Sequence, residues 1–200
     1  MAKAALLVVD VQNDFFPGGT LPVPHADAMI PDLDRVISAF ADAGLPVFFT
    51  RDWHPVNHCS FKALGGPWPP HCVQGTPGAE IHKSIPMPAG SQLVSKGDDP
   101  DRDAYSGFQG TDLADRLGKL GVTDVYIGGL AVEYCVRTTT KDALLDGFGA
   151  HVIVDCVGGA GGSQRRLGSR PQGDGGLRRF DCHVFGSDRF SRRAAVMSSS

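Results

Sequence analysis

Short apolar runs alternate along this chain with segments of helical periodicity, and this alternation is its strongest constraint on the fold. Residues 4–9 form a continuous apolar run, which is typical of a strand buried on both faces of a parallel sheet. Further runs of this kind occupy residues 47–50, 92–95, 122–127 and 151–154. The sequence therefore predicts five strands.

Segments between these runs carry apolar residues at helical spacing. In residues 29–43 the apolar positions are Ile30, Leu33, Val36, Ile37 and Phe40. Residues 111–120 begin with Thr111, a favourable N-cap, and a third helix is predicted over 136–145. Strands that alternate with helices favour an α/β fold with three layers, in which helices flank a doubly wound, mainly parallel sheet.

The composition indicates one domain of ordinary size. The chain has 200 residues and a net charge of −3, and we expect a single domain over residues 1–200. Charge is mixed, with no block of lysine and arginine before residue 165, so neither nucleic acid nor an anionic membrane is an expected partner. We expect a small molecule or a protein as ligand, and both a monomer and a homo-oligomer stay open.

Cysteine usage and the N-terminus both favour the cytoplasm. The five cysteines are an odd number without the spacing of a disulfide framework. The N-terminus lacks a basic region followed by a long apolar stretch, and no apolar run reaches the ~20 residues of a membrane helix. We therefore expect a reducing, cytoplasmic location.

The segment 157–179 differs in composition from the rest of the chain. It is rich in glycine and arginine and has no helical periodicity, which predicts an irregular segment where an α/β sheet normally adds a helix. A solvated tail, an RNA-binding tail and a reading-frame error in the source gene stay open, and the lack of interleaved aromatic residues disfavours RNA. The run 182–185 is a candidate sixth strand.

Residues capable of chemistry gather where the predicted strands end. Asp10 ends the first strand, Asp52 and His54 follow the second, Lys96 ends the third, and Cys135 follows the fourth. In open α/β sheets the ligand crevice lies beyond the carboxyl ends of the strands. We therefore expect these five side chains to form one site.

Cys135 occupies a position that suits a nucleophile. It follows a strand and a glycine-bearing turn and precedes a predicted helix, so the helix dipole and free N–H groups would favour its thiolate. Taken alone, a buried cysteine is more often a small packing residue.

The long segment 52–90 carries candidate metal ligands. Asp52 and His54 are two residues apart, so both side chains can project to one side of extended chain, and His71 or His58 could complete the site. A carboxylate with imidazoles suits a divalent metal ion such as zinc, iron or manganese. The alternative is that the histidines serve only as hydrogen-bonding residues of the loop.

Several long motifs carry a resemblance to a known family. The chain resembles the nicotinamidases, also called pyrazinamidases, of the isochorismatase-like cysteine hydrolases. The resemblance spans roughly residues 4–155, and its motifs are VVDVQNDFFPGGTLPV at 8–23, TRDWHPVNHCSF at 50–61, WPPHCVQGTPGAE at 68–80, VSKGDDPDRDAYSGF at 94–108 and GGLAVEYCVRTT at 128–139.

This resemblance implies a role for each polar candidate. Asp10, Lys96 and Cys135 match a catalytic triad. Asp52, His54 and His71 match ligands of a divalent metal ion, and His58 matches a position that is a fourth ligand in some relatives.

The resemblance also implies the surroundings of the substrate. The backbone N–H groups of Ala131 and Cys135 match an oxyanion hole, and a cis peptide bond precedes the residue that matches Ala131. Phe15 and Trp68 match residues that line the ring pocket, and Leu21 and Tyr134 are further candidates for substrate binding.

The implied activity is hydrolysis of nicotinamide to nicotinic acid and ammonia through a cysteine thioester, in NAD salvage. Pyrazinamide would be converted to pyrazinoic acid in the same way. Two alternatives stay open: a related hydrolase that acts on a carbamoyl or ureido substrate or on isochorismate, and a catalytically inactive binding module. The metal-ligand pattern disfavours the first, and the intact triad disfavours the second.

Overall fold

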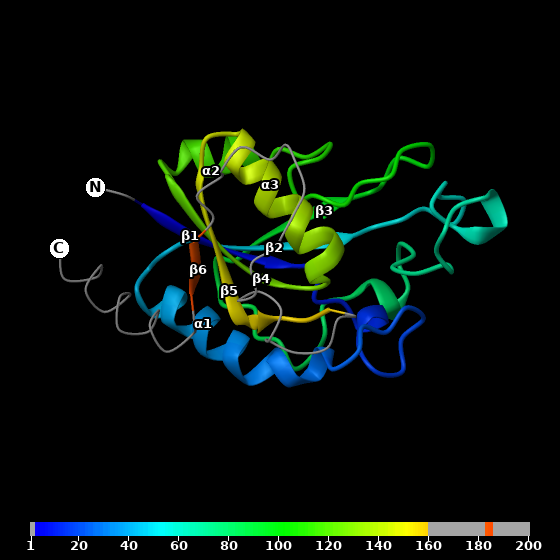
Figure 1. Cartoon of the computed structure of the whole chain (residues 1–200), viewed down its shortest axis with the longest axis horizontal. Coiled ribbons are helices and arrows are strands. Elements are labelled where there is room, and N and C mark those ends of the chain that lie inside the picture. Colours follow the sequence, from blue (N-terminus) through cyan, green and yellow to red (C-terminus); the bar gives the residue numbers. More distant parts are fainter. Residues whose placement is uncertain (1–2, 160–182, 186–200) are drawn as a thin grey trace, which may run out of the picture.

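A parallel β-sheet forms the centre of the protein (Figure 1). The computed structural model describes residues 3–159 and 183–185. Within them the sheet has six strands in the order β3-β2-β1-β4-β5-β6, and each neighbouring pair is parallel. The strands are β1 (Ala4–Val9), β2 (Val47–Asp52), β3 (Gln92–Lys96), β4 (Asp124–Gly129), β5 (Gly149–Val157) and β6 (His183–Phe185).

Helices cover both faces of this sheet. They are α1 (Ile30–Asp42), α2 (Leu113–Lys119) and α3 (Arg137–Leu145). Figure 1 shows α1 on one face and α2 and α3 on the other, which makes three layers. The expected doubly wound α/β fold is therefore confirmed.

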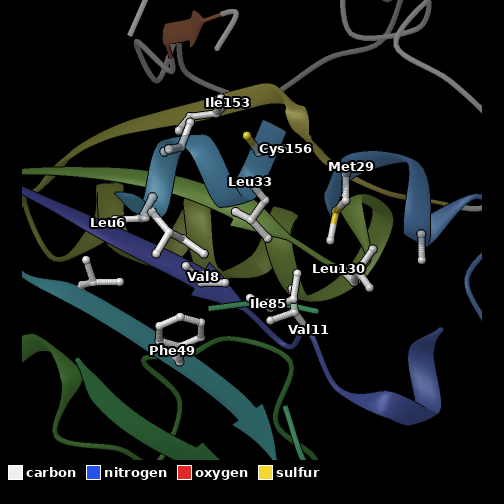
Figure 2. Close-up of a cluster of buried hydrophobic side chains, with 14 of the residues drawn as sticks. Leu6, Val8, Val11, Met29, Leu33, Phe49, Ile85, Leu130, Ile153 and Cys156 are labelled. Atoms are coloured by element: carbon white, nitrogen blue, oxygen red, sulfur yellow. The ribbon is translucent and has the colours of Figure 1, made fainter. Parts of the chain in front are cut away.

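Each face of the sheet has its own apolar core. Successive side chains of a strand point to opposite faces, so Leu6 and Val8 pack toward α1 while Leu7 packs toward α2 and α3. Figure 2 shows the first cluster, in which Leu33 of α1 lies among strand residues. β1 is buried along its whole length, which explains its continuous apolar sequence.

Most predicted elements are confirmed within two or three residues of their ends. α1 covers 30–42 of the predicted 29–43. α2 begins at Leu113, whose N–H donates to the Thr111 hydroxyl oxygen. β4 begins at Asp124 because Val122 closes the end of α2 through its N–H bond to the Leu117 carbonyl. The sixth strand predicted from run 182–185 is present as β6.

The atypical segment 157–179 falls almost entirely outside the described residues. Val157 ends β5, which is longer than the predicted run 151–154 because it pairs with β4 on both sides of a register shift. The prediction for 160–179 therefore stays a prediction. Within the described part of the chain, no helix is long and apolar enough to cross a membrane.

The strand order creates a switch point between β1 and β4. The chain leaves β1 toward β2 on one side and later returns to β4 on the other, and ligand crevices form at such points. The two strands approach closely at their carboxyl ends, where a Cβ on Gly129 would lie 2.0 Å from the Val9 carbonyl oxygen. The long connection from β2 to β3 extends beyond this edge of the sheet (Figure 1).

Candidate active site

The strand ends bring together the residues expected to form a site. Asp52 and Lys96 are the last residues of β2 and β3 and are direct partners in the parallel ladder. Asp10 follows β1 with a left-handed backbone (φ 50°), a conformation that aspartate tolerates better than most residues. Cys135 lies after β4, and its sulfur and a carboxylate oxygen of each of Asp10 and Asp52 all lie within 4.8 Å of one another.

Lys96 is the hub of this group, which we call the triad cluster (Asp10, Lys96 and Cys135). Its side chain is fully buried, and Nζ lies 3.0 Å from Asp10 Oδ2 and 3.7 Å from Cys135 Sγ. The ammonium also donates to Asp52 Oδ1 and, at 3.1 Å, to the Ala104 carbonyl oxygen. One buried positive charge therefore faces two carboxylates and the sulfur.

Opposing charges and burial set the protonation of the triad cluster. Burial alone would lower the pKa of Lys96, but Asp10 and Asp52 outweigh it and raise that pKa well above its ordinary value. Burial raises the pKa of Asp10, and Lys96 only partly offsets this effect. Lys96 is thus held charged, and the Asp10 carboxylate is more basic than an exposed aspartate.

Asp10 presents its two oxygens differently. Oδ1 accepts a hydrogen bond from the Thr50 hydroxyl at 2.7 Å. Among the described residues, no donor makes a well-aligned hydrogen bond to the buried Oδ2, whose contact with Lys96 is ionic. Oδ2 therefore keeps lone pairs that are free to accept a proton.

The environment of Cys135 differs from our expectation of a thiolate at a helix start. Cys135 lies inside a π-helical turn, Val132–Val136, and α3 begins only at Arg137. Burial raises the pKa of Cys135 well above its ordinary value, and Asp10 and Asp52 add to this shift while Lys96 opposes it. The resting thiol is therefore protonated and needs a base before it can attack.

A second group lies beside the first, and we call it the histidine cluster (Asp52, His54 and His71). One ligand atom from each residue lies within 4.8 Å of the others, and all three side chains are buried. His54 Nδ1 lies 2.8 Å from the Gly97 carbonyl oxygen, and His71 Nδ1 lies 2.8 Å from that of Pro69. Because a carbonyl only accepts, both Nδ1 atoms carry a proton, which leaves both Nε2 atoms as the nitrogens that can ligate a metal ion.

This donor set fits a divalent metal ion. Two imidazole nitrogens, each fixed by a backbone carbonyl behind it, and a carboxylate oxygen are ligands that zinc and similar ions take. Burial lowers the pKa of His54 to about 3, so its ring stays neutral at physiological pH. Gly97 has a left-handed backbone (φ +65°), and a Cβ there would lie 2.6 Å from the His54 ring.

His58 lies next to the histidine cluster but outside the group of convergent ligand atoms. Its ring stacks on that of His54 with centroids 4.1 Å apart. Nδ1 lies 2.7 Å from Ser60 Oγ, and Nε2 lies 3.2 Å from the Arg102 carbonyl oxygen. Both ring nitrogens of His58 thus make hydrogen bonds within the protein, and His58 stacks on the candidate ligand His54.

Aromatic side chains surround the two clusters. Phe15 packs against His71 with ring centroids 5.8 Å apart, and Trp68 meets the Tyr134 ring edge-on at 5.2 Å. The Trp68 Nε1–H donates to the Tyr105 hydroxyl at 3.0 Å. Leu21 is half-buried against the core that contains Phe15. Tyr134 is 44% exposed, which places it at the rim.

The backbone before Cys135 has the expected special geometry. The Leu130–Ala131 peptide bond is cis, as the resemblance implied. In the part of the chain that the structure describes, no backbone carbonyl accepts the Ala131 N–H. This N–H is therefore available to an acceptor such as a substrate oxygen.

Several residues that support the site were not predicted from the sequence. Thr50 holds Asp10, Tyr105 holds Trp68, and the Asp14 carboxylate accepts the N–H of Cys72, directly after His71, at 2.7 Å. Gln12 hydrogen-bonds the backbone of Asp52. The motif at 8–23 contains Gln12 and Asp14, but only the folded chain shows what they contact.

Comparison with known proteins assigns the family. The model of the isochorismatase domain matches residues 4–169. The chain belongs to the isochorismatase family. A nicotinamidase from Acinetobacter baylyi is 40% identical over 175 residues, which cover 76% of this chain and 80% of the relative.

Solved structures in this family are also similar to the chain. A pyrazinamidase from Pyrococcus horikoshii in complex with zinc is 43% identical, with a TM-score of 0.77, and covers 98% of this chain and 94% of its own. A protein from L. infantum in complex with nicotinate is 34% identical, with a TM-score of 0.72 and coverage of 80% and 82%. Family membership thus rests on sequence and on fold.

Proposed function

We propose that this chain hydrolyses nicotinamide to nicotinic acid and ammonia, and pyrazinamide to pyrazinoic acid, in NAD salvage. The observation that carries the proposal is the buried Lys96 ammonium, which contacts Asp10, Asp52 and the Cys135 sulfur beside the histidine cluster. The similar nicotinamidase and pyrazinamidase supply the substrate class.

In the first half of the reaction, the Cys135 sulfur attacks the carboxamide carbon. The thiol proton moves to Asp10 Oδ2, and the oxyanion that forms accepts hydrogen bonds from the Ala131 and Cys135 N–H groups. Asp10 then gives the proton to the amide nitrogen, because ammonia is a far better leaving group than an amide anion. The C–N bond breaks, and the acyl group stays on sulfur as a thioester.

In the second half, water replaces sulfur on the acyl carbon. Asp10 takes a proton from the water as its oxygen attacks, and the same N–H groups hold the second oxyanion. The C–S bond breaks, the sulfur recovers a proton from Asp10, and nicotinic acid leaves. Lys96 stays protonated throughout and offsets the negative charge that passes between sulfur and carboxylate.

Asp52, His54 and His71 would hold one divalent metal ion, with zinc favoured over iron or manganese by the similar zinc complex. When bound, the ion supplies a positive charge that orients the pyridine nitrogen, directly or through water. Phe15 and Trp68 flank the ring, with Leu21 and Tyr134 at its periphery. Fixing the ring at one end places the carboxamide carbon near Cys135 at the other.

Ammonia release by the purified full chain tests the proposal. The kcat/KM for nicotinamide should be at least about 10²-fold higher than the kcat/KM for an N-carbamoyl amino acid. Benzamide has the same amide without a ring nitrogen and should be a poor substrate. Preference for the carbamoyl compound would select the alternative hydrolase, and the absence of any turnover would select a binding module.

We also propose a cytoplasmic location and a single domain over residues 1–200. The free state of Cys59, Cys72, Cys135 and Cys156 supports a reducing compartment.

A further inference from the structure

Gln12 makes an unusual set of hydrogen bonds next to the site. The side chain is fully buried, and its Oε1 accepts the Asp52 N–H at 2.7 Å. Its Nε2 donates to the carbonyl oxygens of Asp52 at 2.7 Å and of Ala79 at 2.9 Å. One amide thus bonds both backbone groups of a single residue that lies 40 positions away.

These hydrogen bonds lie directly beyond the last residue pair between β1 and β2. Val9 pairs with Thr50, and the Asp10 N–H donates to the Thr50 carbonyl at 3.1 Å. In a regular parallel ladder, the Asp10 carbonyl would accept the Asp52 N–H next. The left-handed backbone of Asp10 takes the chain out of strand geometry, and the Gln12 amide bonds Asp52 as the missing strand would.

The backbone of Asp52 has to be fixed because its carboxylate faces two ways. Oδ1 accepts from the Lys96 ammonium, and Oδ2 lies 3.8 Å from His54 Nε2. On the other side Asp52 pairs with Lys96 of β3, so Gln12 completes its support between two neighbours. A small rotation of this backbone would move one oxygen away from Lys96 or the other away from the histidines.

We propose that Gln12 is a positioning residue, which replaces the end of β1 and aims the Asp52 carboxylate at Lys96 and at the metal ion together. The inference rests on the proposed metal role of Asp52. An amide is required because the contacts are one N–H and two carbonyls, so a carboxylate lacks the donors and an apolar side chain lacks both. Asp10 can then leave the ladder to serve as base without loosening Asp52.

Titration of the metal-free full chain with Co²⁺, followed by its d–d absorption, tests this role. Gln12→Met keeps the volume and loses all three bonds, and its Co²⁺ affinity should fall at least about tenfold, with a changed band position. Gln12→Asn, whose side chain is one methylene shorter, should also lower the Co²⁺ affinity. It replaces the methionine variant in the test if that variant does not fold.

Two control variants separate positioning from general stability. Asn13→Ala removes the neighbouring bond from Nδ2 to the Pro77 carbonyl, and Val36→Ala removes core volume in α1. Both should bind Co²⁺ within about twofold of wild type even where melting temperature falls, since neither touches Asp52. Wild-type affinity in a folded Gln12 variant would overturn the inference. Failure of the wild-type chain itself to bind Co²⁺ would instead overturn the proposed metal site, and the inference with it.

Discussion

The triad cluster and the histidine cluster lie side by side but are held in different ways. Charge holds the first: the buried ammonium of Lys96 is balanced by Asp10 and Asp52. Neutral backbone groups hold the second, because the carbonyls of Gly97 and Pro69 fix the two histidine rings. Charged contacts move pKa values, whereas carbonyl contacts fix orientation, which supports the proposed roles of the two clusters in proton transfer and in substrate positioning.

Asp52 belongs to the histidine cluster and also contacts Lys96 of the triad cluster. Its two oxygens face Lys96 and His54, so a change that moves this carboxylate is felt in both clusters. Substitutions away from Asp52 should therefore separate the clusters, which the following predictions test.

Cys135→Ala should have the largest effect on turnover. Loss of the nucleophile should lower ammonia release from nicotinamide by at least about 10⁴-fold. Metal affinity should stay unchanged because Cys135 is outside the histidine cluster. Cys59→Ala, at a partly exposed thiol in the β2–β3 connection, is the control and should keep full activity. Near-normal turnover by Cys135→Ala would exclude the thioester.

Lys96→Met should destabilise the metal-free protein by about 3–5 kcal/mol, because it leaves two buried carboxylates without a counter-charge. The deficit should depend on pH. Lys96 opposes the burial that raises the pKa of Asp10, so its loss raises that pKa further above the ordinary 3.8. A folded state that holds this proton more tightly loses stability as pH rises above the unfolded value.

Urea unfolding at about pH 5 and about pH 8 measures this effect. The deficit of Lys96→Met relative to wild type should be larger at the higher pH. An equal loss of unfolding free energy at both pH values would contradict the coupling between Asp10 and Lys96 that the structure indicates.

Substitutions in the histidine cluster should lower metal affinity and leave the reactivity of the Cys135 thiol unchanged. His54→Ala and His71→Ala should each lower metal affinity by at least about 10²-fold and raise KM, whereas His58→Asn should lower affinity by about tenfold or less. Cys135 should still be alkylated by iodoacetamide in all three. His25→Asn, at an exposed histidine with a left-handed backbone, is the control. Equal losses in His58→Asn and His71→Ala would make His58 a ligand.

Trp68→Phe should have the smallest effect. It keeps an aromatic ring and loses the hydrogen bond to Tyr105, which corresponds to a rise in KM of about two- to tenfold. Tyr134→Phe, at the exposed rim, should change KM by less than about twofold. A greater effect of Tyr134→Phe would place its hydroxyl in contact with the substrate.

Local sequence predicted the framework because each strand and helix carries its own period. Residues 4–9 and 29–43 have patterns that need no knowledge of distant residues. Because parallel strands end at one edge, the proximity of Asp10, Asp52, Lys96 and Cys135 followed as well. The spacing of the loop histidines left His71 and His58 as alternative ligands, and the roles of Leu21 and Tyr134 came from resemblance alone, so these roles stay predictions.

The supports of the site could not be predicted, because they depend on where distant segments meet. Gln12 reaches Asp52 and Ala79 across 40 and 67 residues, and Asp14 reaches Cys72 across 58. The protonation of Cys135 also depends on distant segments. A helix start favours the thiolate, but burial and two carboxylates raise the thiol pKa, and burial is a property of the whole fold.

A rapid-quench single turnover with nicotinamide tests the account most directly. Acid-quenched samples are digested, and the mass of the peptide that contains Cys135 is measured by mass spectrometry. Ammonia and nicotinic acid are measured in the same samples. The account predicts that ammonia appears first, together with a nicotinoyl group on Cys135, and that nicotinic acid appears as this group is lost. Simultaneous release of ammonia and nicotinic acid, with Cys135 unmodified at every time, would contradict it.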